Sequence, residues 1–284
     1  MNVLILGKVC NEKKKDLDFL IRIFSGLIYV ILILFSIEKG EQTFRIVMMM
    51  LSFFCLFEFL LILKTNTTLI KITSLFFLFS IFMDLFIRKE KGLILYVICF
   101  IPYSIIFLVI QLFSPKYSPK EKIVQISHLI FGLVYIIMPF YLASYIYAMI
   151  HHGKQLILGV FILIWTNDSL SYLIGKKWGR RKIAISISPK KSIEGVIGGL
   201  FFCLILGFFL YKIWKEKYWF ILSLTVPIFS TIGDLVESTI KRSCSVKNSG
   251  ILFPGHGGFL DRLDSFIFVI PIIATVVASI IYIF

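Results

Sequence analysis

Long apolar stretches, separated by short polar segments, follow one another along most of the chain. A helix that crosses a lipid bilayer needs about 20 consecutive and mostly apolar residues. The stretches that meet this requirement predict an all-α, polytopic integral membrane protein with about nine transmembrane helices. The expected spans are residues 19–37, 44–63, 69–87, 92–113, 126–149, 156–174, 195–214, 218–237 and 265–284.

The longest polar segment in the C-terminal half covers residues 231–265 and contains carboxylates, lysines, arginines, a histidine and several glycines. If Asp234 lies on a helix, Ser238 and Lys241 follow it at positions i+4 and i+7 and share its face. Residues 253–258 are rich in glycine and include a proline, which predicts a loop that lets the backbone approach a ligand closely.

Two further carboxylates, Asp261 and Asp264, stand three residues apart near the start of the last apolar helix. With Asp234 they give three carboxylates in one segment that also holds cationic side chains. Such a set suits a divalent metal ion whose other partners are phosphate oxygens. The alternative is a solvated connection between two helices with ordinary capping residues. We favour the metal and phosphate interpretation because this chemistry rarely gathers beside membrane segments without a function.

The sixth expected span ends in a second polar region, residues 165–172. Polar side chains inside a membrane helix need partners, because the hydrocarbon core offers none. Asp168 and Tyr172 share a face at i and i+4, and we expect this face to line a polar cavity. The alternative is a hydrogen-bonded cluster between helices with a structural role only.

A basic cluster at residues 175–182 follows, and then a segment that leads into the seventh span. Ser188, followed by a proline, is expected to be the N-cap of that helix. Lys191 and Ser192 would then lie near a helix N-terminus, where backbone N–H groups and the helix dipole favour anions, so we expect a phosphate site there. The three glycines within 195–199 would let this helix pack closely on a neighbour.

Composition and charge narrow the class of protein. Of the 284 residues, 58% are hydrophobic, whereas an average soluble domain has roughly 45–50%. The formal net charge of +14 indicates basic cytoplasmic loops and contact with anionic lipids, and not nucleic acid. Most lysines and arginines outside the spans fall on the side of the N-terminus and of both polar regions, which predicts a cytoplasmic N-terminus. The scattered cysteines, without a CxxC pair, do not indicate a disulfide frame or a zinc site.

The polar segment at residues 114–119 is the best candidate for a division of the chain. We expect N-terminal transmembrane helices over residues 1–125 and a C-terminal catalytic transmembrane region over 126–284. The second region would carry two cytoplasmic loops, 175–194 and 238–264.

Charged residues inside the N-terminal spans are a functional hint by default. Arg22, Arg45 and Lys71 lie near span ends, where their side chains can reach the interface, so we expect no function of them. Glu58 and Asp84 could pair with a cation inside the bundle, and their role is left open.

The motifs of the C-terminal half, taken together, closely resemble those of the phosphatidate cytidylyltransferase family, also called CDP-diacylglycerol synthases. The resemblance covers residues 165–265, and its most specific part runs from Ser238 to Asp264. It rests on Asn167-Asp168-Ser169, on Ser188-Pro189-Lys190-Lys191-Ser192-Ile193-Glu194-Gly195, on Gly233-Asp234-Leu235-Val236-Glu237-Ser238 with Lys241-Arg242, on Pro254-Gly255-His256-Gly257-Gly258, and on Asp261-Arg262-Leu263-Asp264-Ser265.

This resemblance implies that CTP and phosphatidate react to give CDP-diacylglycerol and pyrophosphate with Mg²⁺, and it leaves open a second, monovalent or divalent, cation. It also implies a multi-pass protein of the cell inner membrane, in contact with membrane lipids, and often a homodimer. The implied metal ligands are Asp234, Asp261 and Asp264. The implied catalytic residues are Asp234, Asp261, Lys241, Arg242 and His256. The implied substrate-binding residues are Asn167, Asp168, Ser188, Lys191, Ser192, Glu194, Ser238, Gly257 and Arg262.

Two positions depart from the family pattern. Asn248 follows Lys247 where the family usually has an aspartate, and Ile193 replaces a frequent aromatic residue. Alternatives with other chemistry stay open: a CTP-dependent polyprenol or phytol kinase, which would release CDP; a transporter whose intramembrane carboxylates handle ions; and a catalytically silent scaffold, for which Asn248 is the only indication.

Overall fold

The computed structural model describes residues 24–65, 68–87, 109, 118–250 and 257–283. Most of the expected span at 92–113 lies outside these residues, as do Arg22 and His256. The side chain of Asp84 is also outside the described part.

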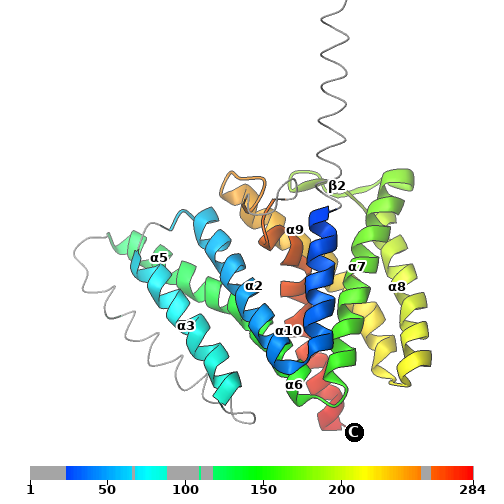
Figure 1. Ribbon diagram of the computed structural model, residues 1–284. Helices are drawn as coiled ribbons and strands as arrows, with labels where there is room; N and C mark the ends of the chain where they lie inside the picture. The colour runs from blue at the N-terminus through cyan, green and yellow to red at the C-terminus, as the bar shows by residue number, and fades with distance from the viewer. Residues whose placement is uncertain (1–23, 66–67, 88–108, 110–117, 251–256, 284) are drawn as a thin grey trace, which may run out of the picture.

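Nearly all of the described chain is helical (Figure 1). A helix over residues 24–39 comes first. It is followed by α2 (Glu41–Ile62), α3 (Thr68–Ile87), α5 (Pro119–Phe131), the π-helical segment η1 (Gly132–Ile137), α6 (Met138–Met149), α7 (Gly153–Trp178), β1 (Lys182–Ala184), β2 (Ser188–Ser192), α8 (Ile193–Trp214), α9 (Tyr218–Ser243) and α10 (Leu260–Ile283).

Six helical segments among the described residues are long and apolar enough to cross a membrane. They are Glu41–Ile62, Pro119–Met149, Gly153–Trp178, Ile193–Trp214, Tyr218–Ser243 and Leu260–Ser279. This confirms an α-helical, multi-pass membrane protein. The count of nine spans and the cytoplasmic N-terminus stay predictions. The division at residue 125 also stays a prediction, and that residue lies inside α5, whose first turn is fixed by a capping box between Ser118 and Glu121.

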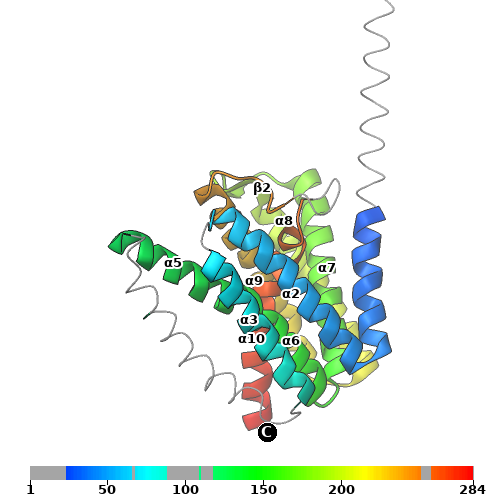
Figure 2. The ribbon, with the colours of Figure 1, turned by 60° about the vertical axis from the view of Figure 1, so that its left-hand side comes forward.

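The helices pack around a core of large aromatic and aliphatic side chains. Phe266 of α10 lies against Phe140 of α6 and stacks on Phe161 of α7, with ring centroids 5.4 and 4.9 Å apart. In both ribbon views α3 and α5 lie on one side of α2 and the helix of residues 24–39 on the other (Figures 1 and 2). The N-terminal helices therefore pack on the same bundle that carries the polar motifs of α7 to α10.

Glycines bring α8 against α7, as the sequence predicts. A Cβ atom at Gly199 would come within 2.1 Å of Ser171 Oγ and 2.6 Å of Asn167 Oδ1. A Cβ atom at Gly195 would lie 2.6 Å from the backbone oxygen of Ser171. Since real Cβ atoms do not approach so closely, only glycine permits this contact, and the polar end of α7 is held directly against α8.

The connection between α7 and α8 differs from the prediction. Residues 188–192 form the strand β2, which pairs antiparallel with β1. The N-cap of α8 is Ser192, whose Oγ accepts a hydrogen bond from Gly195 N at 3.2 Å. The prediction that Ser188 is the N-cap was therefore wrong. Pro189 fits the first turn of a helix but is also tolerated in an edge strand, which is where it lies here.

The hairpin β1–β2 and the connection between α9 and α10 lie at the same end of the bundle, and α10 ends at the opposite end (Figure 1). The two polar regions, far apart in the sequence, thus meet at one end of the molecule.

Candidate functional site

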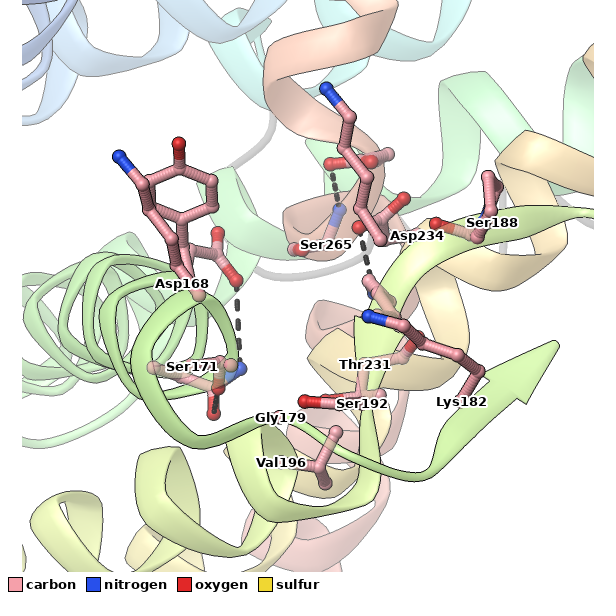
Figure 3. A pocket seen from close by; sticks show the side chains of 18 of the residues that line it. Asp168, Ser171, Gly179, Lys182, Ser188, Ser192, Val196, Thr231, Asp234 and Ser265 are labelled. Carbon is pink, nitrogen blue, oxygen red and sulfur yellow. Dashed lines mark hydrogen bonds and ion pairs between the residues drawn. The ribbon is translucent and has the colours of Figure 1, made fainter. Parts of the chain in front are cut away.

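A cavity of about 680 Å³ opens where the two polar regions meet (Figure 3). Its walls come from α7, the hairpin, the start of α8, α9 and the first turns of α10. The lining residues are Asn167, Asp168, Ser171, Tyr172, Gly175, Lys176, Gly179, Lys182, Ser188, Pro189, Lys190, Lys191, Ser192, Val196, Thr231, Asp234, Asp261, Asp264 and Ser265. The cavity interpretation of the polar end of α7 is confirmed.

Three carboxylates converge on the α9–α10 side of this cavity. Asp234, Glu237 and Asp264 each offer one oxygen, and these oxygens lie within 4.8 Å of one another. Glu237 is only 1% exposed, and no described residue donates a hydrogen bond to its Oε1. A buried carboxylate oxygen without a donor is costly, and a cation among the three oxygens would offset that cost. This oxygen-only set therefore fits a divalent ion such as Mg²⁺.

Lys241 lies between two of the acidic side chains. Its Nζ is 2.5 Å from Glu237 Oε2 and 2.5 Å from Asp261 Oδ1. Glu237 and Lys241 are one helical turn apart on α9, whereas Asp261 comes from α10. The lysine thus joins the two helices and neutralises part of the acidic side.

Asp261 is held by backbone donors as well as by Lys241. Its Oδ2 accepts hydrogen bonds from Ser249 N at 3.0 Å and Gly258 N at 2.9 Å. Gly257 packs against the same carboxylate: its φ is +89°, and a Cβ atom there would lie 2.2 Å from Asp261 Oδ2. Glycine is required at 257 because an L side chain would be strained and would collide with this carboxylate. Asp261 lines the cavity, and its role as a metal ligand stays a prediction.

An ion pair joins the acidic side to the hairpin. Lys191 Nζ lies 2.7 Å from Asp234 Oδ2 and donates a hydrogen bond to the backbone oxygen of Thr231 at 3.2 Å. Asp234 Oδ1 accepts a hydrogen bond from Ser238 Oγ at 3.3 Å, one turn further along α9. A phosphate group bound by Lys191 would therefore also lie close to the carboxylate of Asp234 on α9.

The polar end of α7 is bonded to α9. Ser230 Oγ donates to Asp168 Oδ1 at 3.1 Å, and Asn167 Nδ2 donates to Ser230 Oγ at 3.2 Å. Ser171 Oγ donates to Asn167 Oδ1 at 3.3 Å. Asn167 is buried, and it links two helices, while Asp168 and Ser171 also line the cavity. The α7 side chains of the hydrogen-bonded cluster between α7 and α9 are thus also side chains that line the cavity.

Three of the lysines on the hairpin side, Lys176, Lys182 and Lys190, line the cavity together with Lys191. Glu194 fixes the hairpin from outside: its carboxylate accepts hydrogen bonds from Arg180 N at 3.0 Å and Arg181 N at 3.1 Å. Lys182, Lys190 and Lys191 are therefore carried on a segment that is tied to the first turn of α8, whereas Lys176 lies at the end of α7.

Most of the expected site residues meet at this cavity. Those that line it are Asn167, Asp168, Ser188, Lys191, Ser192, Asp234, Asp261 and Asp264. Ser238, Lys241 and Gly257 contact its carboxylates directly. Among the described residues, Glu194, Arg242 and Arg262 are not part of the lining. Arg242 is exposed and donates to the backbone oxygen of Val246. His256 lies outside the described residues.

The sequence interpretation missed Glu237, which stands three residues after Asp234 on the same face of α9. That spacing could have indicated it, because positions i and i+3 of a helix are neighbours. It also assigned no role to Lys182 and Lys190, since a basic segment next to a membrane span is commonly explained by its lipid contacts.

Comparison with known proteins identifies the family of the chain. The model of the cytidylyltransferase family matches residues 20–280. The phosphatidate cytidylyltransferase of Bacillus subtilis (strain 168) is 31% identical over 265 residues, which cover 88% of this chain and 94% of that protein. The phosphatidate cytidylyltransferase of Staphylococcus aureus (strain COL) is 46% identical over 125 residues, 43% of this chain and 48% of that protein. The match extends well beyond the motifs into the N-terminal helices, and the chain belongs to the cytidylyltransferase family.

Proposed function

We propose that this protein is a phosphatidate cytidylyltransferase, a nucleotidyltransferase that converts CTP and phosphatidate to CDP-diacylglycerol and pyrophosphate in phospholipid biosynthesis. The names of its relatives support the activity. The observation that carries the proposal is the cavity itself, where Lys191 pairs with Asp234 beside the carboxylates of Glu237 and Asp264. A site with cations on one side and clustered carboxylates on the other suits two phosphate-bearing reactants and a metal ion.

In the proposed reaction, a phosphate oxygen of phosphatidate attacks the α-phosphorus of CTP. A new phosphorus–oxygen bond forms, and the bond from the α-phosphorus to the bridging oxygen breaks, so that pyrophosphate leaves with the electron pair. The nucleophile is already anionic, and no strong general base is required. The main barrier is electrostatic, because two polyanions must approach each other. Lys191, with Lys182 and Lys190 on the same side of the cavity, would neutralise phosphate oxygens as they enter.

The residues that would hold a divalent cation are Asp234, Glu237 and Asp264, and Asp261 is the family-based addition to this set. When bound, Mg²⁺ supplies positive charge close to the phosphate oxygens. Lys241 bridges Glu237 and Asp261 by binding both, so its positive charge is already shared between these two carboxylates. A role of Lys241 towards the leaving group follows only if Asp261 releases it.

The position of the cavity at one end of a membrane-spanning bundle fits the two substrates. The acyl chains of phosphatidate can stay in the bilayer while CTP enters from water. The basic loops at this end support a cytoplasmic orientation in the cell inner membrane, since lysine and arginine are enriched on that side. The homodimer implied by the family resemblance belongs to the same proposal, and light scattering of the protein in detergent would test it.

The direct test uses the purified full-length protein in detergent with phosphatidate, Mg²⁺ and CTP labelled at the α-phosphate. We expect a labelled liponucleotide and an equal amount of pyrophosphate. Release of CDP, with the γ-phosphoryl group moved to a lipid alcohol, would instead support the CTP-dependent polyprenol or phytol kinase. If neither product forms with the wild-type protein, the proposed function is wrong.

A further inference from the structure

A buried carboxylate from the N-terminal half of the chain binds the segment that carries Asp261 and Asp264. Glu58 lies near the end of α2 and is only 1% exposed. Its Oε1 accepts a hydrogen bond from Phe259 N at 3.0 Å. Its Oε2 accepts one from Leu260 N at 3.0 Å and one from Ser249 Oγ at 2.9 Å. Glu58 is not among the residues that line the cavity.

We propose that Glu58 is a positioning residue, which sets the place of Asp261 and Asp264 through the N-terminus of α10 and through Ser249. The inference rests on the proposed function in one respect, namely that these carboxylates serve a cation site. It concerns a residue of α2, outside the motifs that carry the family resemblance.

The first connection runs through the helix end. Leu260 is the first residue of α10, and Asp261 and Asp264 follow on its first two turns. The first N–H groups of a helix have no acceptor inside it, and they form the positive end of its dipole. The carboxylate of Glu58 accepts the first of these N–H groups, from Leu260, and that of Phe259 just before the helix. Such charge-assisted hydrogen bonds are shorter and stronger than neutral ones. Glu58 therefore anchors the turn from which both aspartates project.

The second connection runs through Ser249. Its hydroxyl donates to Glu58, and its Oγ can then accept the hydrogen bond from Asp261 N, at 3.4 Å. The backbone N–H of Ser249 donates to Asp261 Oδ2 at 3.0 Å. A hydroxyl has one proton to give and two lone pairs to accept with, so Glu58 decides the direction of this small network.

The surroundings of Glu58 are shaped to its carboxylate. A Cβ atom at Gly258 would lie 2.0 Å from Glu58 Oε2, and one at Gly250 would lie 2.7 Å from Oε1. One turn earlier on α2, Phe54 stacks on Phe259 with ring centroids 4.7 Å apart. The sequence left open whether Glu58 pairs with a cation. Among the described residues, no lysine or arginine forms an ion pair with it. Its partners are backbone and hydroxyl donors.

The test replaces Glu58 by glutamine. Glu58→Gln keeps the shape but sets an NH₂ group against at least one of the three donors. We expect Mn²⁺, added without substrates to the purified protein and measured by electron paramagnetic resonance, to bind roughly 10-fold more weakly or worse, as for other residues that orient metal ligands. Amide hydrogen exchange at Ser249, Phe259 and Leu260 should become faster. The matched control is Glu38→Gln, because Glu38 is exposed and pairs with Lys154 far from the cavity.

A second variant, Ser249→Ala, guards against a Glu58 variant that fails to fold. It removes one of the two connections only, and we expect a smaller loss of Mn²⁺ affinity. Combined with Glu58→Gln, it should add little, because both act on one network. Unchanged Mn²⁺ affinity in either single variant would overturn the proposal, as would a wild-type protein that binds no Mn²⁺. A wild-type protein that binds Mn²⁺ tightly but makes no liponucleotide would refute the proposed function and leave the role of Glu58 standing.

Discussion

The two sides of the cavity hold their charges in different ways. On the α9–α10 side, Asp234, Glu237 and Asp264 cluster, and Lys241 pairs with Glu237 and Asp261. Glu237 and Lys241 are largely buried. On the hairpin side, Lys182, Lys190 and Lys191 are carried on a short sheet and Lys176 on the end of α7. Within the described part of the chain, Lys191 alone of these pairs with a carboxylate of the cavity. A buried charge depends strongly on its partner, whereas an exposed charge is screened by water and salt. The acidic side should therefore tolerate substitution far less than the basic side.

The largest effect is expected for Lys241→Met, which leaves Glu237 and Asp261 without their shared cation. Removal of one partner of a buried ion pair costs about 3–5 kcal/mol, so the midpoint of thermal unfolding in detergent should fall together with turnover. An unchanged unfolding midpoint would show that the acidic side does not need this lysine. It would contradict the expectation that the acidic side tolerates substitution less than the basic side.

The next-largest effect is expected for Asp264→Asn. This change keeps the size of the side chain but removes one negative charge from the cluster that Asp264 forms with Asp234 and Glu237. We expect liponucleotide formation at saturating CTP to fall on the order of 10²–10³-fold, the usual cost of losing one preorganised electrostatic group. Folding should be retained, and membrane insertion would verify this. Glu38→Gln, at the other end of the bundle, is the control and should have wild-type turnover.

A smaller effect is expected for Lys191→Gln on the hairpin side. The loss of one charged hydrogen bond to a phosphate is worth about 1.5–3 kcal/mol, which should appear mainly as a KM for CTP raised roughly 10-fold or more. The difference from wild type should shrink as salt is added. Lys154→Gln removes a lysine that pairs with Glu38 instead, and a similar change in KM there would contradict a specific role of Lys191.

The smallest effect is expected for Glu194→Gln. This half-buried side chain accepts hydrogen bonds from Arg180 N and Arg181 N, and it is not part of the cavity lining. We expect turnover to fall roughly two- to fivefold. A loss as large as that of Asp264→Asn would mean that Glu194 contacts a substrate after all.

The apolar stretches located the helices well at one end of the bundle. The expected ends at residues 149 and 214 and the start at 218 agree with α6, α8 and α9. At the end with the cavity the agreement is poorer, because α7 continues to Trp178 and α9 to Ser243. An apolar stretch marks only the part of a helix that crosses the hydrocarbon core of the bilayer. The helix can continue into water on polar residues, which hydropathy does not detect.

Motif spacing placed Asp234, Lys191 and Asp264 around one site, but it could not show their pairing. Whether Lys241 would bind Asp261, a residue of another helix, depends on how α9 and α10 pack. The hydrogen bonds of Glu58 are further still from local sequence, since its partners lie about 190 or more positions away in the chain. Long-range contacts of this kind are set by tertiary packing, which no local pattern records.

The anchoring of α10 by α2 limits how this protein can be divided. A fragment that began at residue 126 would keep every motif by which the family is recognised, yet the amides of Phe259 and Leu260 would lose the acceptor that Glu58 provides. We therefore expect that the motif-bearing half cannot be transplanted or trimmed as an autonomous unit. Its chemistry is supported by a helix that carries none of it.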